Sequence, residues 1–131
     1  EQGRAASAVE HSNQIEAMRT MCRDMMVTMA PFDAWLMPTL PMLPRTHGYY
    51  DMDLDFTTYD DTRMGPDCCY TAAFNASGAP AISLPLGWSD EGWPIGIQLV
   101  GRDGDEATLL RLSAQLEQAQ PWEQQLPGVC S

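Results

Sequence analysis

The stretch FNASGAPAISLPLGWSDEGWPIGIQLVG, residues 74–101, contains two short apolar runs separated by a polar turn. The runs are residues 80–86 and 94–100, and each has the length of a strand, contains Ile or Val, and is bounded by Gly and Pro. This pattern is typical of β-strands. The polar turn carries Gly92 near its end, which suits a hairpin loop that closes on a residue with positive φ. The stretch therefore predicts a β-hairpin over residues 80–100.

Both faces of these predicted strands are small or apolar. Large aliphatic residues alternate with small residues or a single glutamine, and neither run contains a charge. Strands that are covered by helices on both sides have this composition. Pro85 cannot donate a hydrogen bond to a neighbouring strand, so we expect it at the end or on the unpaired side of its strand.

The remaining elements follow from periodicity and from helix-ending residues. Apolar residues spaced by three and four positions predict a helix over 4–29, which Pro31 ends. A buried strand over 33–37 follows, and then a long loop over 38–65. A helix over 66–77 is predicted to begin at Pro66 and to end at Gly78 with positive φ, and the last helix covers 105–119, with Asp103 or Asp105 as its cap.

Composition excludes several classes of partner. The 131 residues include 18 acidic residues and seven arginines but no lysine, giving a net charge of −11. This charge disfavours nucleic acid and anionic membranes as partners. No apolar run approaches the roughly 20 residues that a membrane-spanning helix needs. The four cysteines and two histidines have no metal-site spacing, so we expect no metal, and free thiols in a reducing cytoplasm.

The predicted loop over 38–65 has three possible roles. The series Asp51-x-Asp53-x-Asp55 resembles the start of a calcium loop, but Phe56 stands at position six and Thr62 at position twelve, where Gly and Glu are needed. The aromatic residues could line a substrate funnel, with Tyr49 and Tyr50 as the first candidates. Alternatively, the loop is a solvated acidic segment whose aromatic residues fold back on the core. His47 has no recognisable nucleophile beside it and is not expected to be catalytic.

A longer motif carries a resemblance to a known family. The order Asn75-x-x-Gly78-x-Pro80-Ala81-x-Ser83-x-Pro85, then Gly92-x-Pro94-Ile95-Gly96-x-Gln98-Leu99-Val100-Gly101, then Glu106, Leu109, Leu110 and Leu116-Glu117, resembles the C-terminal end of the amidase signature family. That family consists of amide hydrolases that use a Ser–cis-Ser–Lys triad, and some members are transamidases acting on charged tRNA. The resemblance implies a small amide substrate and no metal or organic cofactor.

The resemblance also implies what this chain lacks. It contains no lysine and no Gly/Ser-rich signature, so the family's catalytic lysine and both catalytic serines are expected upstream of Glu1. No catalytic residue is therefore assigned here, and the chain is expected to supply scaffold and part of the substrate pocket and to be inactive alone. Structural roles are expected for the family's turn and strand residues, namely Gly78, Pro80, Pro85, Gly92, Pro94 and Gly96.

Two further residues are candidates for the pocket wall. Thr39 follows the predicted strand in a Pro-Thr-x-Pro sequence, and ligands of open α/β sheets lie beyond the carboxyl ends of strands. Thr39 could equally cap or turn the chain. In the family, the corner that holds Asn75 is close to the substrate, although Asn75 could instead support the turn that follows it.

The whole pattern predicts an α/β fold: part of an amidase-signature domain with a mixed sheet, flanking helices, and a C-terminal hairpin followed by a helix. Open sheet edges and bare helix faces would then bind the remainder of the amidase fold, or further copies of the chain. The alternative is a stand-alone, non-catalytic interaction module that reuses the amidase tail and binds a partner through the helix over 4–29.

Overall fold

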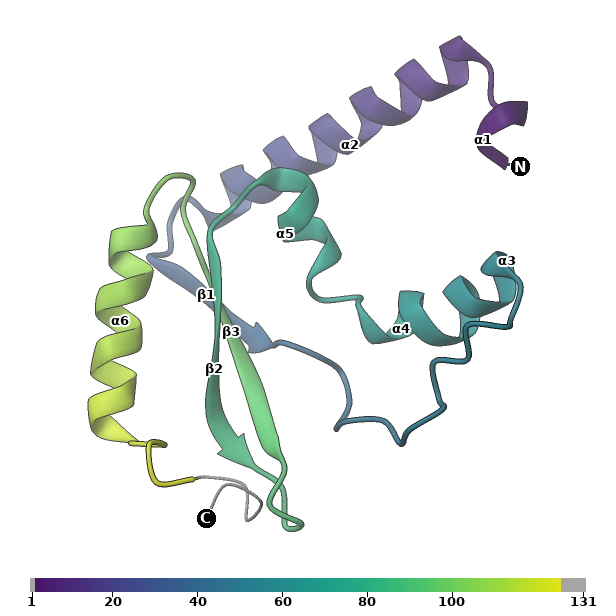
Figure 1. Ribbon diagram of the computed structural model, residues 1–131. Helices are drawn as coiled ribbons and strands as arrows, with labels where there is room; N and C mark the ends of the chain where they lie inside the picture. The colour runs from purple at the N-terminus through teal and green to yellow at the C-terminus, as the bar shows by residue number, and fades with distance from the viewer. Residues whose placement is uncertain (1, 126–131) are drawn as a thin grey trace.

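The computed structural model describes residues 2–125 and has a three-stranded sheet at its centre (Figure 1). The strands are β1 (Ala34–Pro38), β2 (Ala81–Trp88) and β3 (Pro94–Gly101), in the order β1-β3-β2. Trp35 pairs with Val100 and Ile82 pairs with Leu99, both in antiparallel register. The expected α/β architecture is confirmed. Within the described residues, however, every strand pair is antiparallel, so this part of the chain does not form the mixed sheet that we expected.

The β2–β3 hairpin is closed by a short hydrogen-bonded turn. The Ser89 N–H donates to the Trp93 carbonyl at 2.9 Å, and the Gly92 N–H donates to the Ser89 carbonyl at the same distance. Gly92 has φ 84°, a backbone conformation that favours glycine. Further along, the Gly101 N–H donates to the Pro80 carbonyl. The backbone N–H and C=O groups of successive residues point to opposite edges of a strand, and the C=O of Pro80 faces β3. The backbone of Pro85 therefore faces away from β3, on the unpaired edge of β2 and next to a bulge.

Helix α6 (Glu106–Ala119) covers one face of the sheet (Figure 1). Its Leu109 packs against Leu84 and Leu99, and all three are almost fully buried. Asp105 caps the helix by accepting a hydrogen bond from the Thr108 N–H at 3.3 Å, so the second of the two expected caps is the one observed.

Helices α2 (Ala8–Met29) and α5 (Ala72–Ser77) cover the other face through a second buried cluster. Val100 of β3 packs there with Met29 and Phe74. Leu99 and Val100 point to opposite faces because side chains alternate along a strand. The N-terminal part of α2 extends away from the sheet (Figure 1), and Met18 and Met21 in the middle of the helix are exposed.

The expected single helix over 4–29 is divided in two. A short helix α1 (Gln2–Ala5) comes first, and α2 begins only after Ser7. The Ser7 hydroxyl accepts from the Glu10 N–H at 3.2 Å, and the Glu10 carboxylate accepts from the Ser7 N–H at 2.7 Å. This capping box fixes Ser7 in an extended conformation, which ends α1 and starts α2.

The expected loop over 38–65 also contains helical structure. Residues 56–67 form three short turns: α3 (Phe56–Tyr59), the π-helix η1 (Asp60–Met64) and α4 (Gly65–Asp67). Pro66 has no N–H, so the Thr62 carbonyl receives no helix hydrogen bond from it. The Gly65 N–H donates to the carbonyl of Asp60, five residues earlier, and this spacing makes the turn a π-helix, which is wider than an α-helix. The freed Thr62 carbonyl accepts from the Tyr49 hydroxyl at 3.3 Å.

The expected helix over 66–77 is interrupted at residues 68–71. Cys68 leaves the helical conformation, and the chain becomes helical again only at Ala72. The Cys68 carbonyl accepts from the Thr71 hydroxyl at 3.2 Å, and the Tyr70 carbonyl accepts from the Gln98 side chain at 3.3 Å. The Cys68 carbonyl also accepts from the Thr71 and Ala72 N–H groups, so the Gln98 side chain takes the place of a helix donor only at the Tyr70 carbonyl. Gly78, with φ 76°, ends α5 in the left-handed conformation.

Candidate functional site

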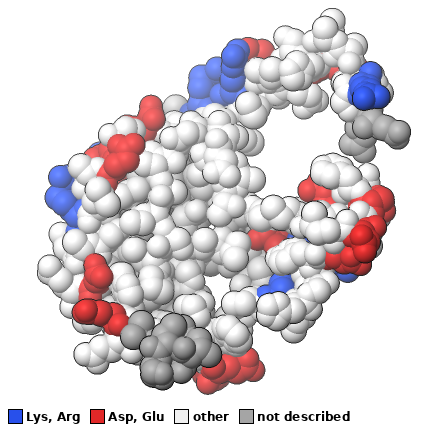
Figure 2. All heavy atoms as spheres, viewed as in Figure 1, with Lys and Arg blue, Asp and Glu red and all other residues white. Residues whose placement is uncertain are grey.

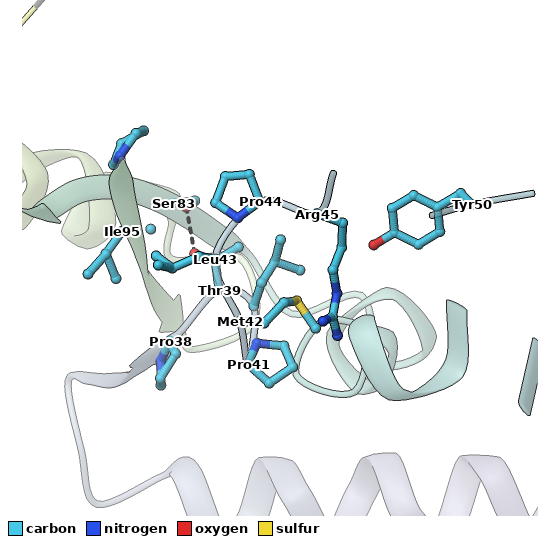
Figure 3. A pocket seen from close by; sticks show the side chains of 13 residues that line it. Pro38, Thr39, Pro41, Met42, Leu43, Pro44, Arg45, Tyr50, Ser83 and Ile95 are labelled. Atoms are coloured by element: carbon cyan, nitrogen blue, oxygen red, sulfur yellow. Dashed lines mark hydrogen bonds between the residues drawn. The ribbon is translucent and has the colours of Figure 1, made fainter. Parts of the chain in front are cut away.

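A hollow of about 690 Å³ lies on the sheet face that is turned away from α6, where the chain leaves β1 (Figure 3). Its wall combines the segment after β1 with the facing ends of β2 and β3. The lining residues are Pro38, Thr39, Leu40, Pro41, Met42, Leu43, Pro44, Arg45, Tyr50, Ser83, Pro94, Ile95 and Gly96. Most of them are apolar, so the hollow is an aliphatic surface with a few polar groups.

Two hydroxyl groups meet at the floor of the hollow. The side-chain oxygens of Thr39 and Ser83 are 2.6 Å apart and hydrogen-bonded (Figure 3). Gly96 makes this contact possible, because a Cβ at this position would lie 2.9 Å from the Thr39 oxygen and 3.0 Å from the Ser83 oxygen. The Thr39 N–H also donates to the Gly96 carbonyl at 2.9 Å. One hydroxyl of the pair can donate to the other and still accept a hydrogen bond from a ligand.

The side wall of the hollow is held by an ion pair. The Arg45 Nε donates to Asp67 Oδ2 at 3.1 Å, and the Arg45 Nη2 donates to Asp67 Oδ1 at 2.9 Å. The Tyr50 hydroxyl donates to Asp67 Oδ2 at 2.7 Å. Asp67 is only 2% exposed, and the Arg45 hydrogen bonds hold the pKa of its carboxyl below the usual range. The bond to this carboxylate raises the pKa of Tyr50.

Tyr49 lies beside this ion pair but outside the hollow. The guanidinium groups of Arg45 and Arg63 lie 4.5 Å and 4.7 Å from the centre of its ring. The Arg63 Nε donates to the Tyr49 carbonyl at 3.0 Å, and the Tyr49 ring meets the Tyr50 ring edge-on at 5.1 Å. These contacts tie the loop to the η1–α4 segment.

The structure therefore separates the four predicted pocket residues. Thr39 and Tyr50 both line the hollow, whereas Tyr49 supports its wall from behind. Asn75 is exposed on α5 and is not one of the lining residues. The turn after α5 is supported by Ser77 instead, whose hydroxyl donates to the Phe74 carbonyl and accepts from the Ala79 N–H.

The acidic series in the loop has local structural roles. Asp51 Oδ1 accepts from the Asp53 N–H at 2.9 Å, and Asp55 Oδ1 accepts from the Thr58 N–H at 3.1 Å as the cap of α3. Within residues 2–125, no three His, Cys, Asp or Glu side chains are grouped so as to hold a metal ion. Nor does this part of the chain contain a helix that is both long and apolar enough to cross a bilayer.

Sequence reasoning missed three residues that shape the hollow: Ser83, Arg45 and Asp67. For Ser83 a signal was present, because it is a polar residue inside an otherwise apolar strand near the Pro-Thr corner. Arg45 was visible as the one arginine between positions 24 and 62. Nothing in the sequence marks Asp67 among the 18 acidic residues.

Comparison with known proteins assigns the family. The model of the Amidase family matches residues 2–110, so this chain belongs to the amidase signature family. The 6-aminohexanoate-cyclic-dimer hydrolase of Pseudomonas sp. (strain NK87) is 53% identical over 58 residues, which are 44% of this chain and 12% of that protein.

Solved structures agree with this assignment. A structure of 6-aminohexanoate cyclic dimer hydrolase superposes with a TM-score of 0.88 at 28% identity, covering 97% of this chain and 28% of the other. A structure of a 6-aminohexanoate cyclic dimer hydrolase complexed with substrate gives a TM-score of 0.72 at 29% identity, covering 93% and 27%. This chain thus spans little more than a quarter of these two solved chains.

Proposed function

We propose that this chain is the C-terminal part of an amidase that hydrolyses carboxylic amides, and that its serine nucleophile lies upstream of Glu1. The observation that carries the proposal is the family match over residues 2–110 in a sequence that contains no lysine. The family's triad needs that lysine, so the catalytic residues belong to another part of the complete protein. The partial coverage of the matching structures supports this division.

In the complete enzyme, this part serves as scaffold and as one wall of the substrate pocket. The hollow beside Thr39, Ser83 and Gly96 lies beyond the carboxyl end of β1, the position that ligands occupy in open α/β sheets. The free edges of β1 and β2 would continue into a mixed sheet formed with the upstream part. The related hydrolase solved with its substrate supports a small amide as the ligand.

The chemistry follows the family's mechanism. The upstream serine, activated through the cis-serine and the lysine, attacks the amide carbonyl, and backbone N–H groups stabilise the oxyanion. The C–N bond then breaks, the amine takes up a proton from the triad and leaves, and water hydrolyses the acyl-serine ester to release the carboxylic acid. No step requires a side chain of this segment, so the isolated segment is inactive.

Its thiols, free at Cys22, Cys68 and Cys69, suit a reducing cytoplasm.

The test compares the 131-residue chain with the protein expressed from the longest open frame that contains it. We expect the longer protein to release ammonia from hexanamide, and the chain alone to release none above buffer. Ammonia release by the chain alone, with its mass confirmed by spectrometry, would refute the assignment of the nucleophile. A longer protein that carries the Ser and Lys residues but hydrolyses no amide would refute the proposed activity.

A further inference from the structure

The hollow has one ionised side chain in its wall, and that charge is already neutralised. Among the described residues that line it, Arg45 is the only one charged at neutral pH. Two of its three guanidinium nitrogens donate to Asp67, at 3.1 Å and 2.9 Å. These two nitrogens form the edge of the guanidinium that can bind a carboxylate through two hydrogen bonds, and Asp67 already occupies it.

Asp67 is held in place by burial and by a third hydrogen bond. Its side chain is 3% exposed, whereas that of Arg45 is 35% exposed and remains in contact with the hollow. The Tyr50 hydroxyl donates to Asp67 at 2.7 Å. If Arg45 turned to a ligand, the buried Asp67 carboxylate would lose its charged donor, which costs free energy. A ligand carboxylate that binds weakly therefore cannot take the guanidinium away from Asp67.

The polar groups that stay available to a ligand are the third guanidinium nitrogen of Arg45, whose charge is balanced by Asp67, and uncharged hydroxyls. The Thr39–Ser83 hydroxyl pair lies on the floor, and the rest of the surface is mainly proline, leucine, isoleucine and methionine. An aliphatic chain fits such a surface, and a carboxylate would enter it without a free cation to compensate for its lost hydration.

We propose that Asp67 determines the substrate specificity of this hollow. By neutralising Arg45, it makes the hollow accept the uncharged aliphatic part of an amide and reject substrates that carry a carboxylate there. This inference rests on the proposed amidase function and adds to it the class of substrate. Asp67 does not touch the substrate; it acts through Arg45 and is a positioning residue.

The experiment uses two substrates of equal chain length: hexanamide, and adipic acid monoamide, which ends in a carboxylate. In the complete protein, we expect kcat/KM for hexanamide to exceed that for adipic acid monoamide at least tenfold. The Asp67→Asn variant frees the Arg45 guanidinium and is expected to raise the relative kcat/KM of adipic acid monoamide about tenfold, mainly through KM.

Two matched variants separate the freed guanidinium from other effects. Asp61→Asn makes the same change of charge at an exposed position of η1, and we expect it to leave the substrate ratio unchanged. The double variant Arg45→Met/Asp67→Asn lacks the guanidinium and should return the ratio to that of the unmodified protein. A shift caused equally by Asp61→Asn, or retained in the double variant, would overturn the proposal.

Binding calorimetry with the same two amides keeps the proposal testable if a variant fails to fold. The unmodified protein should bind hexanamide and should bind adipic acid monoamide at least tenfold more weakly. Equal binding of both amides, or binding of neither, overturns the specificity proposal even when hydrolysis is observed. Selective binding of hexanamide without hydrolysis supports the specificity of the hollow and refutes the proposed activity.

Discussion

Gly96 illustrates how the absence of a side chain shapes the site. Thr39 follows β1 and Ser83 lies in β2, and their hydroxyls meet over the Gly96 backbone because no Cβ separates them. We expect Gly96→Ala to force this pair apart and to lower the free energy of unfolding by about 1–3 kcal/mol, the usual cost of overpacking. Urea unfolding of the 131-residue chain measures this change.

Gly3 provides the matched control for Gly96. It lies in α1 and has no positive φ, and a Cβ added there would have no heavy atom within 4 Å. Gly3→Ala should therefore change the free energy of unfolding by less than about 0.5 kcal/mol. If the two substitutions had equal effects, the close contact at Gly96 would not be the cause of the destabilisation.

At the same scale, the sequence located Thr39 and Tyr50 of the hollow but not the ion pair behind them. Thr39 was found because the carboxyl end of a strand is a common ligand position. The fold brings Asp67 into contact with Arg45, which is 22 residues away in the sequence, and with Tyr50, which is 17 residues away. Sequence spacing contains no information on such a contact, because it depends on how the intervening loop folds.

At the scale of elements, apolar periodicity predicted the long elements and failed at their interruptions. The hairpin and the last helix follow directly from the residue pattern. The capping box at Ser7 divides the first helix, and Pro66 widens the turn before it. Both interruptions depend on local hydrogen bonds, which the spacing of apolar residues does not indicate. At the break over 68–71, the Gln98 side chain likewise donates to the Tyr70 carbonyl, a contact that apolar spacing does not indicate.

Two adjacent leucines of α6 test how this helix is held. Leu109 is 3% exposed and packs between β2 and β3, whereas Leu110 is 62% exposed. Leu109→Ala should lower the free energy of unfolding by about 2–5 kcal/mol, because it leaves a cavity in the core. Leu110→Ala should lower it by less than about 0.5 kcal/mol. Urea unfolding of both variants decides this, and similar losses would show that α6 does not dock through Leu109.

At the scale of the whole molecule, the described chain is an open structure with uncovered apolar surface. The sheet has a free edge on β1 and another on β2, and the middle of α2 exposes Met18 and Met21. Figure 2 shows acidic side chains gathered over the α3 region, where Asp60 and Asp61 are exposed. This charge opposes association there, so contacts between copies should form at the sheet edges and the α2 face.

The β1 edge is the better template for pairing. The Thr39 N–H faces β3, so alternation turns the Leu36 N–H and carbonyl toward the free edge, and the Leu36 side chain is 65% exposed. On β2, Pro85 removes a donor from the middle of the free edge and a bulge bends the strand, whereas the proline on the β1 edge, Pro38, stands at the end of that strand. In the proposed complete enzyme, the upstream part would cover the β1 edge, whereas the chain alone should self-associate through it.

Sedimentation velocity over a range of concentrations tests this prediction. The unmodified 131-residue chain should form dimers or larger species as its concentration rises, and Leu36→Lys should weaken association about tenfold by placing a charge beside the pairing edge. Leu110→Lys adds the same charge on the exposed face of α6 and should associate like the unmodified chain. If the unmodified chain stays monomeric at every concentration, the prediction of an uncovered pairing edge is wrong. If Leu36→Lys and Leu110→Lys weaken association equally, net charge rather than the β1 edge controls it.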